Sequence, residues 1–97
     1  MLIDFNSLAK ACYNNKYELP PTFDEHEQLS DINVQEAYKY LGMMEDNNSF
    51  FEFRGATIEL LKTILTIAYI KQINLNDFFN ISLNLPERWY YIKNINN

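Results

Sequence analysis

The 97-residue sequence predicts a single all-α domain over residues 1–97, a small bundle of four to five helices around one central buried helix. Apolar residues recur at helical spacing along most of the chain, capping patterns precede two long apolar stretches, and no segment has a convincing strand pattern. Two glycines and three prolines are too few for a turn-rich β-sandwich. Hydrophobic residues make up 47% and charged residues 22%, as in folded globular proteins.

The first helix is expected close to the start of the chain. Four apolar residues follow the i, i+3, i+4, i+7 spacing of one helical face: Phe5, Leu8, Ala9 and Cys12. We expect this helix to end before Asn14-Asn15. The chain is then extended at Leu19, because the proline that follows disfavours the helical conformation there.

A capping box, Thr22-Phe23-Asp24-Glu25, marks the start of a second helix that is expected to run to Met44 unless Ser30-Asp31 restarts it. Apolar residues lie on two opposite faces of this helix. One face carries Val34, Ala37, Tyr38, Leu41 and Met44, and the other carries Leu29, Ile32, Glu36, Lys39, Tyr40 and Met43. A helix with two partly apolar faces lies between neighbours or is buried at a dimer interface.

A second capping box, Ser49-Phe50-Phe51-Glu52, precedes a third helix that is expected to continue to Gln72. Apolar residues cover most of its circumference, which predicts the central buried helix. Its narrow polar stripe comprises Glu52, Glu59, Lys62, Thr63 and Thr66.

Asn74 and Asp77 form a weaker cap for a fourth helix. The apolar residues of this helix are Leu75, Phe78, Phe79 and Leu83. Pro86 is expected to end it and to open a last turn that carries Trp89 and Ile92.

The net charge of −5 is unevenly distributed. Residues 17–53 contain nine acidic residues and one lysine, whereas residues 60–97 contain four basic and two acidic residues. No basic stripe is present, so direct nucleic-acid binding is not expected, and the chain could instead bind a basic surface or a cation. The alternative is that the acids only keep a small domain soluble.

The sequence also bears on location. The most apolar stretch, residues 56–70, is interrupted by Glu59 and Lys62 and is too short to span a bilayer, so we expect a cytoplasmic protein without membrane contact.

Few residues are equipped for catalysis. The single histidine, His26, lies in an acidic run, and Cys12 is interpreted as a core residue. Carboxylates are plentiful, and Glu36 and Glu59 each project from a partly apolar face, where facing helices would let them hold Mg²⁺. The alternative is that Glu36 pairs with Lys39, and Glu59 with Lys62, as i, i+3 ion pairs.

The stretch from Glu59 to Tyr90 resembles the C-terminal half of MazG-like all-α nucleotide pyrophosphohydrolases. The resemblance rests on Ile73-Asn74-Leu75-Asn76-Asp77, on the closing Arg88-Trp89-Tyr90 and on the order of the helices. It implies four acids, in a Glu-x-x-Glu and a Glu-x-x-Asp pair, that bind Mg²⁺. It also implies cleavage of nucleoside triphosphates to the monophosphate and pyrophosphate, in dimers or tetramers.

The sequence departs from that pattern at two of the four acids. Glu36 matches the first acid of the earlier pair, but Lys39 stands at the second position. Glu59 replaces the later Asp, and Ala56 stands in place of its partner acid. Two carboxylates beside a lysine bind Mg²⁺ poorly, so the departures predict that the chemistry has been lost.

We therefore expect a non-catalytic binding or inhibitory protein without a cofactor that acts as a homodimer on a basic, nucleic-acid-handling protein. Small acidic chains of this kind are familiar among phage and mobile-element inhibitors, by analogy only. The candidate contact residues are Asp24, Glu25, Glu27, Asp31, Glu45 and Asp46. Trp89 and Tyr90 form a second candidate surface or close the end of the bundle. The alternatives are a divergent Mg²⁺-dependent pyrophosphohydrolase and a regulator that binds a nucleotide without cleaving it.

Overall fold

The computed structural model describes residues 4–46 and 49–78, and this part of the chain contains helices and no strand. The elements are α1 (Phe5–Lys16), the 3-10 turn η1 (Phe23–Glu25), α2 (His26–Asp46), α3 (Phe50–Ile70) and the short α4 (Leu75–Asp77). The all-α fold class predicted from the sequence is confirmed. Trp89 and Tyr90, together with the expected last turn, lie outside the described residues.

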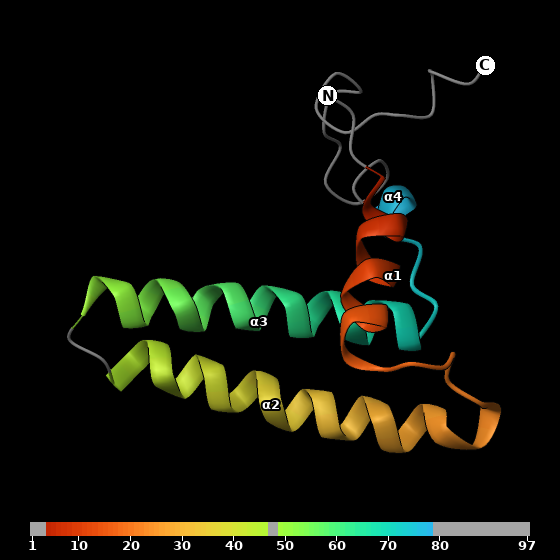
Figure 1. The fold of residues 1–97 in the computed structure, drawn as a ribbon, viewed down its shortest axis with the longest axis horizontal. Helices are drawn as coiled ribbons and strands as arrows, with labels where there is room; N and C mark the ends of the chain where they lie inside the picture. The colour runs from red at the N-terminus through yellow and green to blue at the C-terminus, as the bar shows by residue number, and fades with distance from the viewer. Residues whose placement is uncertain (1–3, 47–48, 79–97) are drawn as a thin grey trace.

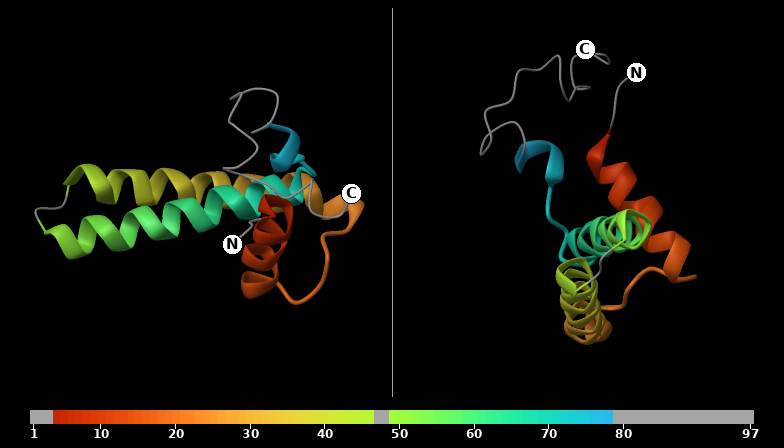
Figure 2. Two further views of the ribbon diagram at one scale, coloured as in Figure 1. Left: turned by 90° about the horizontal axis from the view of Figure 1, so that it is seen from above. Right: turned by 90° about the vertical axis from the view of Figure 1, so that its left-hand side faces the viewer.

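Helices α2 and α3 form a long antiparallel hairpin, and α1 crosses one end of it (Figure 1). We call this end, where α2 begins and α3 finishes, the base, and the opposite end, where α2 passes into α3, the tip. Helix α3 packs against both α2 and α1, so it is the central helix, and α4 lies beside the start of α1 (Figure 2). Among the described residues, the half of the hairpin toward the tip therefore consists of two helices only.

Side-chain caps fix the starts of the long helices. The Asp4 carboxylate accepts hydrogen bonds from the backbone N–H groups of Asn6 and Ser7 at the start of α1. Ser49 caps α3 as predicted, with its hydroxyl accepting from the Glu52 N–H. These bonds satisfy donors that have no partner within their own helix.

The capping box at Thr22 forms, but it starts a different element from the one expected. The Glu25 Oε1 accepts from the Thr22 N–H at 3.0 Å and from the Thr22 hydroxyl at 2.7 Å. This arrangement opens η1, and the α-helix α2 follows from His26 to Asp46, two residues beyond the expected end at Met44.

Two other boundaries differ from the prediction. Helix α1 continues through Asn14-Asn15 to Lys16, because residues of its last turns are held by other elements. Helix α3 ends at Ile70 rather than at Gln72, since Gln72 adopts a left-handed conformation with φ 57°. The Ile73 N–H then turns back to the Ala68 carbonyl at 2.9 Å, a common way for a helix to end.

The core is at the base and is centred on Tyr13, whose side chain is 1% exposed. Its ring packs against Tyr17 and Tyr69 with centroid distances of 4.9 and 4.8 Å, and its hydroxyl donates to the Leu19 carbonyl at 2.8 Å. The first-helix stripe predicted from the sequence is therefore only partly right, because Tyr13 is buried and Leu8 is 43% exposed.

A fully buried asparagine joins α1 to α2. Asn33 is 0% exposed, and its amide nitrogen donates to the Leu29 carbonyl and to the Tyr17 hydroxyl at 2.8 and 3.0 Å. The Asn33 Oδ1 accepts from the Lys16 Nζ at 2.6 Å. All of these polar groups are paired, as burial requires.

The start of α1 is tied to the segment that contains α4. Asn6 donates to the Asn74 Oδ1 at 2.9 Å and accepts from the Leu75 N–H at 2.7 Å, while Asn76 donates to Asp4 at 3.0 Å. The pKa of the Asp4 carboxyl lies below its usual range, chiefly because Asn76 donates to it. These bonds place residues 74–77 beside α1.

Helix α3 presents its faces differently from the prediction. Thr63 and Thr66, expected on a polar stripe, are buried, and each hydroxyl donates to the carbonyl four residues earlier at 2.8 Å. Ile58, Leu61 and Ile64 are 41, 57 and 49% exposed. The exposure of the two faces is inverted because α1 covers the threonine side of α3. Threonine hydroxyls whose hydrogen bonds are satisfied within their own helix can be buried there.

We expect Tyr13→Ala to lower the free energy of unfolding by about 3–5 kcal/mol, because it removes two aromatic contacts from a closed core and leaves a cavity. Phe23→Ala is a matched control, since the Phe23 ring is 91% exposed, and it should change stability by less than about 0.5 kcal/mol. Urea unfolding followed by circular dichroism measures both. Equal losses would show that the core is not centred on Tyr13.

Candidate functional site

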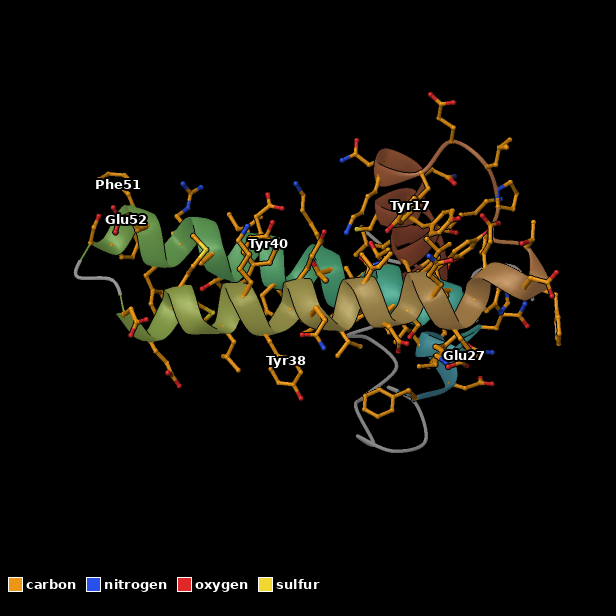
Figure 3. The ribbon with its side chains drawn as sticks, turned by 90° about the horizontal axis from the view of Figure 1, so that it is seen from below. Tyr17, Glu27, Tyr38, Tyr40, Phe51 and Glu52 are labelled. Atoms are coloured by element: carbon orange, nitrogen blue, oxygen red, sulfur yellow. The ribbon has the colours of Figure 1, made fainter. Side chains whose placement is uncertain are left out.

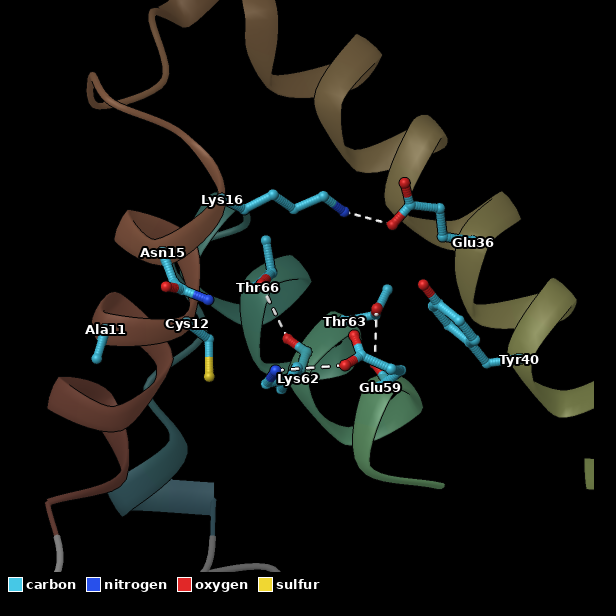
Figure 4. Close-up of a pocket in the computed structure, with 10 residues that line it drawn as sticks. All are labelled: Ala11, Cys12, Asn15, Lys16, Glu36, Tyr40, Glu59, Lys62, Thr63 and Thr66. Carbon is cyan, nitrogen blue, oxygen red and sulfur yellow. Dashed lines mark hydrogen bonds and ion pairs between the residues drawn. The ribbon is translucent and has the colours of Figure 1, made fainter. Parts of the chain in front are cut away.

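A cleft of about 500 Å³ lies between α1, α2 and α3 near the base. It brings together the two carboxylates that the sequence singled out, Glu36 from α2 and Glu59 from α3 (Figure 4). Cys12 from α1 and Tyr40 from α2 also line it. Glu36 and Glu59 thus lie on neighbouring helices and line the same cleft.

Glu36 is paired with Lys16, which reaches across from the end of α1 (Figure 4). The pairing with Lys39 expected from the sequence does not form. The Lys39 Nζ lies instead 5.7 Å from the centroid of the Tyr40 ring. Lys16 prevails because it also donates to the buried Asn33, so that one ammonium group satisfies two acceptors on α2.

Glu59 is paired with Lys62 within α3, as the ion-pair alternative predicted. The Nζ–Oε1 distance is 3.3 Å, and both side chains are about half exposed, at 49% for Lys62 and 46% for Glu59. Such a pair contributes little to stability. The pair does place the positive charge of Lys62 beside the Glu59 carboxylate, which a metal ion would need as a ligand.

The cleft residues do not fit the magnesium site that the resemblance implies. Each of its two carboxylates faces a lysine, and Thr63 and Thr66 donate their hydroxyl hydrogens to backbone carbonyls. Within residues 4–46 and 49–78, no group of three or more His, Cys, Asp or Glu side chains is placed to hold a metal ion. Mg²⁺ prefers several oxygen ligands and is repelled by neighbouring ammonium groups.

The cysteine in the cleft wall is poorly suited to nucleophilic chemistry. Burial raises the pKa of the Cys12 thiol, and the nearby Lys62 only partly opposes that effect. The thiol is therefore protonated near neutral pH, and a protonated thiol is the unreactive form.

Four candidate acids lie together at the base, on η1 and the first turns of α2. Glu25 belongs to the capping box, and Glu27 accepts from the Lys71 Nζ at 2.8 Å. Asp24 and Asp31 are exposed, and neither side chain has a hydrogen-bond or ion-pair partner among the described residues. We call Asp24, Glu25, Glu27 and Asp31 the base acids.

The other two candidate acids, Glu45 and Asp46, are exposed at the tip. Helix α2 has 21 residues and is roughly 30 Å long, so the tip and the base acids cannot contact the same small region of a partner. The single acidic surface expected from the sequence is thus divided between the two ends of the hairpin.

A third surface was not singled out as a site from the sequence. It is an apolar groove between α2 and α3, bounded by Val34 and Leu41 on α2 and by Leu60 and Ile67 on α3. The signal was present in the apolar stripe that includes Ala37. That stripe was interpreted only as packing surface or a dimer interface.

Comparisons with known proteins do not assign the chain to a family. No protein family, curated protein or solved structure is significantly similar to it. Among the described helices, none combines the length and the apolar character needed to cross a membrane.

The two cleft lysines should differ in their structural roles. We expect Lys16→Met to lower the free energy of unfolding by about 1–2 kcal/mol, because the buried Asn33 Oδ1 loses its donor and Glu36 loses its counter-ion. Lys62→Met, the same change in the same cleft, should alter stability by less than about 0.5 kcal/mol. Thermal and urea unfolding of both variants measure the difference, and a larger loss for Lys62→Met would contradict these roles.

Proposed function

We propose that the protein is a non-catalytic acidic binding protein whose base acids contact a basic surface of a partner protein. The observation that carries the proposal is the difference between two sets of carboxylates. Those in the cleft, Glu36 and Glu59, are neutralised by lysines, whereas Asp24 and Asp31 at the base are exposed and unpaired within the described part of the chain. The charge available to a partner is therefore on the surface and not in the cleft.

Two of the base acids, Glu25 and Glu27, are held in the charged form by their neighbours. The Thr22 hydroxyl and N–H hold the pKa of Glu25 below its usual range, and the ammonium group of Lys71 does the same for Glu27. Both carboxylates therefore stay ionised at neutral pH and below. A fixed negative surface speeds encounter with a positive one and selects against acidic partners.

The partner class follows from the sign of the charge. A protein of net charge −5 is repelled by phosphate backbones, so we infer that it binds a protein and not nucleic acid directly. Basic grooves that bind nucleic acid are the most strongly positive protein surfaces, and the base acids would occupy such a groove as phosphates do. A host nucleic-acid-handling protein inhibited by a phage or mobile element is one such case, by analogy only.

The double reversal Asp24→Lys/Asp31→Lys tests the proposal, because it leaves the capping box and the Glu27–Lys71 pair intact. We expect it to weaken binding of a fluorescent arginine-rich peptide at least about tenfold, or roughly 1.4 kcal/mol. The unaltered protein should bind less tightly as salt rises. Fluorescence anisotropy at two salt concentrations measures both effects.

The matched control is Asp46→Lys/Glu52→Lys, which changes net charge equally but at the tip. It should retain most of the affinity for the same peptide. Equal losses in the two double variants would mean that the peptide responds to overall charge, and the base acids would then not be a site.

The alternative function is a divergent nucleoside triphosphate pyrophosphohydrolase. The observation that favours it is the convergence of Glu36 and Glu59 from the two hairpin helices on one cleft. Their pairing with Lys16 and Lys62 argues against metal binding, and we give it second place for that reason.

We expect no pyrophosphate release when the protein is incubated with nucleoside triphosphates and Mg²⁺ or Mn²⁺. Release that disappears in Glu36→Gln and Glu59→Gln but persists in the surface variant Glu18→Gln would restore the enzyme. Thermal stabilisation by a nucleotide without turnover would instead support a nucleotide-binding regulator.

A further inference from the structure

The hairpin has an apolar groove on the side that faces away from α1. In Figure 3, Tyr38 projects from one side of α2, whereas Tyr40, which lines the cleft, projects from the side of α1. Of the described residues, those that line the groove are apolar apart from the Tyr38 hydroxyl, and none is charged. Ile64 lies across the groove from Tyr38, on α3.

This groove is open to solvent. Tyr38 is 65% exposed, Leu41 46% and Ile64 49%, and Leu61, one turn before Ile64, is 57% exposed. Phe53, two turns before Leu60, continues the same side of α3 and is 44% exposed. Side chains of this size and exposure each present about 100 Å² of apolar surface, or roughly 500 Å² together.

Residues 4–46 and 49–78 form no separate core in the half of the hairpin toward the tip. Between Val34 and Lys62, Ala56 is the only buried residue in the part of the chain that the structure describes. Two helices in one layer leave their apolar faces uncovered, and a stable architecture needs a second layer.

We propose that a second copy of this chain covers the groove, so that two hairpins form a four-helix bundle about a two-fold axis. An apolar area of roughly 500 Å² is what the apolar part of a standard interface of about 800 Å² per partner contains. An uncharged groove also lets two copies of an acidic chain approach each other, whereas a basic partner would be recognised by carboxylates.

The charges beside the groove fix how the copies are arranged. Asp31 and Glu45 lie seven residues before and after Tyr38, so the groove side of α2 carries acids. Arg54 lies seven residues before Leu61, so this side of α3 carries a cation near the tip. A two-fold axis along the hairpin sets α2 of each copy over α3 of the other and brings Glu45 to the level of the other copy's Arg54.

The first test is the oligomeric state, measured by sedimentation of the full chain over a range of concentrations. We expect a dimer whose dissociation constant rises at least about thirtyfold in Ile64→Lys, since a charge is then buried at the centre of an apolar interface. Ile58→Lys is the matched control, because Ile58 is on the same helix with 41% exposure and does not line the groove, and this variant should dimerise normally. A wild-type monomer, or equal effects of the two variants, would overturn the proposal.

The second test is mixing of charge-reversal variants. Glu45→Arg and Arg54→Glu should each weaken the homodimer, because like charges then meet twice across the two-fold axis. An equimolar mixture should regain the dimer, since both contacts between the two different chains pair opposite charges. If the mixture forms no more dimer than the separate variants do, the proposed arrangement is overturned. Circular dichroism of each variant checks that it is folded.

Dimerisation does not rest on the proposed function, and the two sets of tests can fail independently. Ile64, Glu45 and Arg54 are not base acids, whereas the peptide-binding test changes Asp24 and Asp31. Only Asp31 belongs to both surfaces. The mixing test therefore does not use it, and the single variant Asp24→Lys tests peptide binding without changing the groove side.

Discussion

The rest of the structure depends on where α1 crosses the hairpin. Helix α1 crosses at a steep angle near the base (Figure 1), where Tyr13 packs against Tyr69 of α3, so only the half of the hairpin toward the base is covered. Every fully buried side chain larger than alanine in the described chain lies in this covered half. The cleft and the core at the base are therefore consequences of where α1 crosses, whereas the apolar groove lies on the side of the hairpin that faces away from α1.

The contact between α1 and α2 explains why, among the described residues, the cleft has no metal site. The joint between α1 and α2 is polar, since Asn33 is buried and needs a donor for its Oδ1. Lys16 supplies that donor, and its ammonium group is thereby held beside Glu36. A carboxylate that serves as a structural counter-ion is not available to Mg²⁺, because releasing it would leave the Lys16 ammonium group without its counter-ion. Stabilising α1 and binding a metal are competing uses of Glu36.

Local signals allowed the helices to be predicted, whereas long-range contacts decided which faces are buried. The caps at Thr22 and Ser49 involve residues three apart, and both were found from the sequence. The Lys16–Glu36 pair joins residues 20 apart, and the bonds from Asn6 to residues near Asn74 join residues nearly 70 apart. No periodicity encodes such partners. Thr63 and Thr66 are buried in place of the aliphatic residues because α1 packs on their side of α3. Both sides of α3 were apolar enough to pack against α1.

The two proposed surfaces are connected through symmetry. In the proposed dimer the axis runs along the hairpin, so both tips lie at one end and both bases at the other. Two copies of Asp24 and of its acidic neighbours would then face the same direction, and a basic groove could contact both at once. Two linked contacts raise affinity well above that of either alone. A chain whose base acids number only four would thereby present an acidic surface of twice that size, without any acid in the apolar groove that holds the copies together.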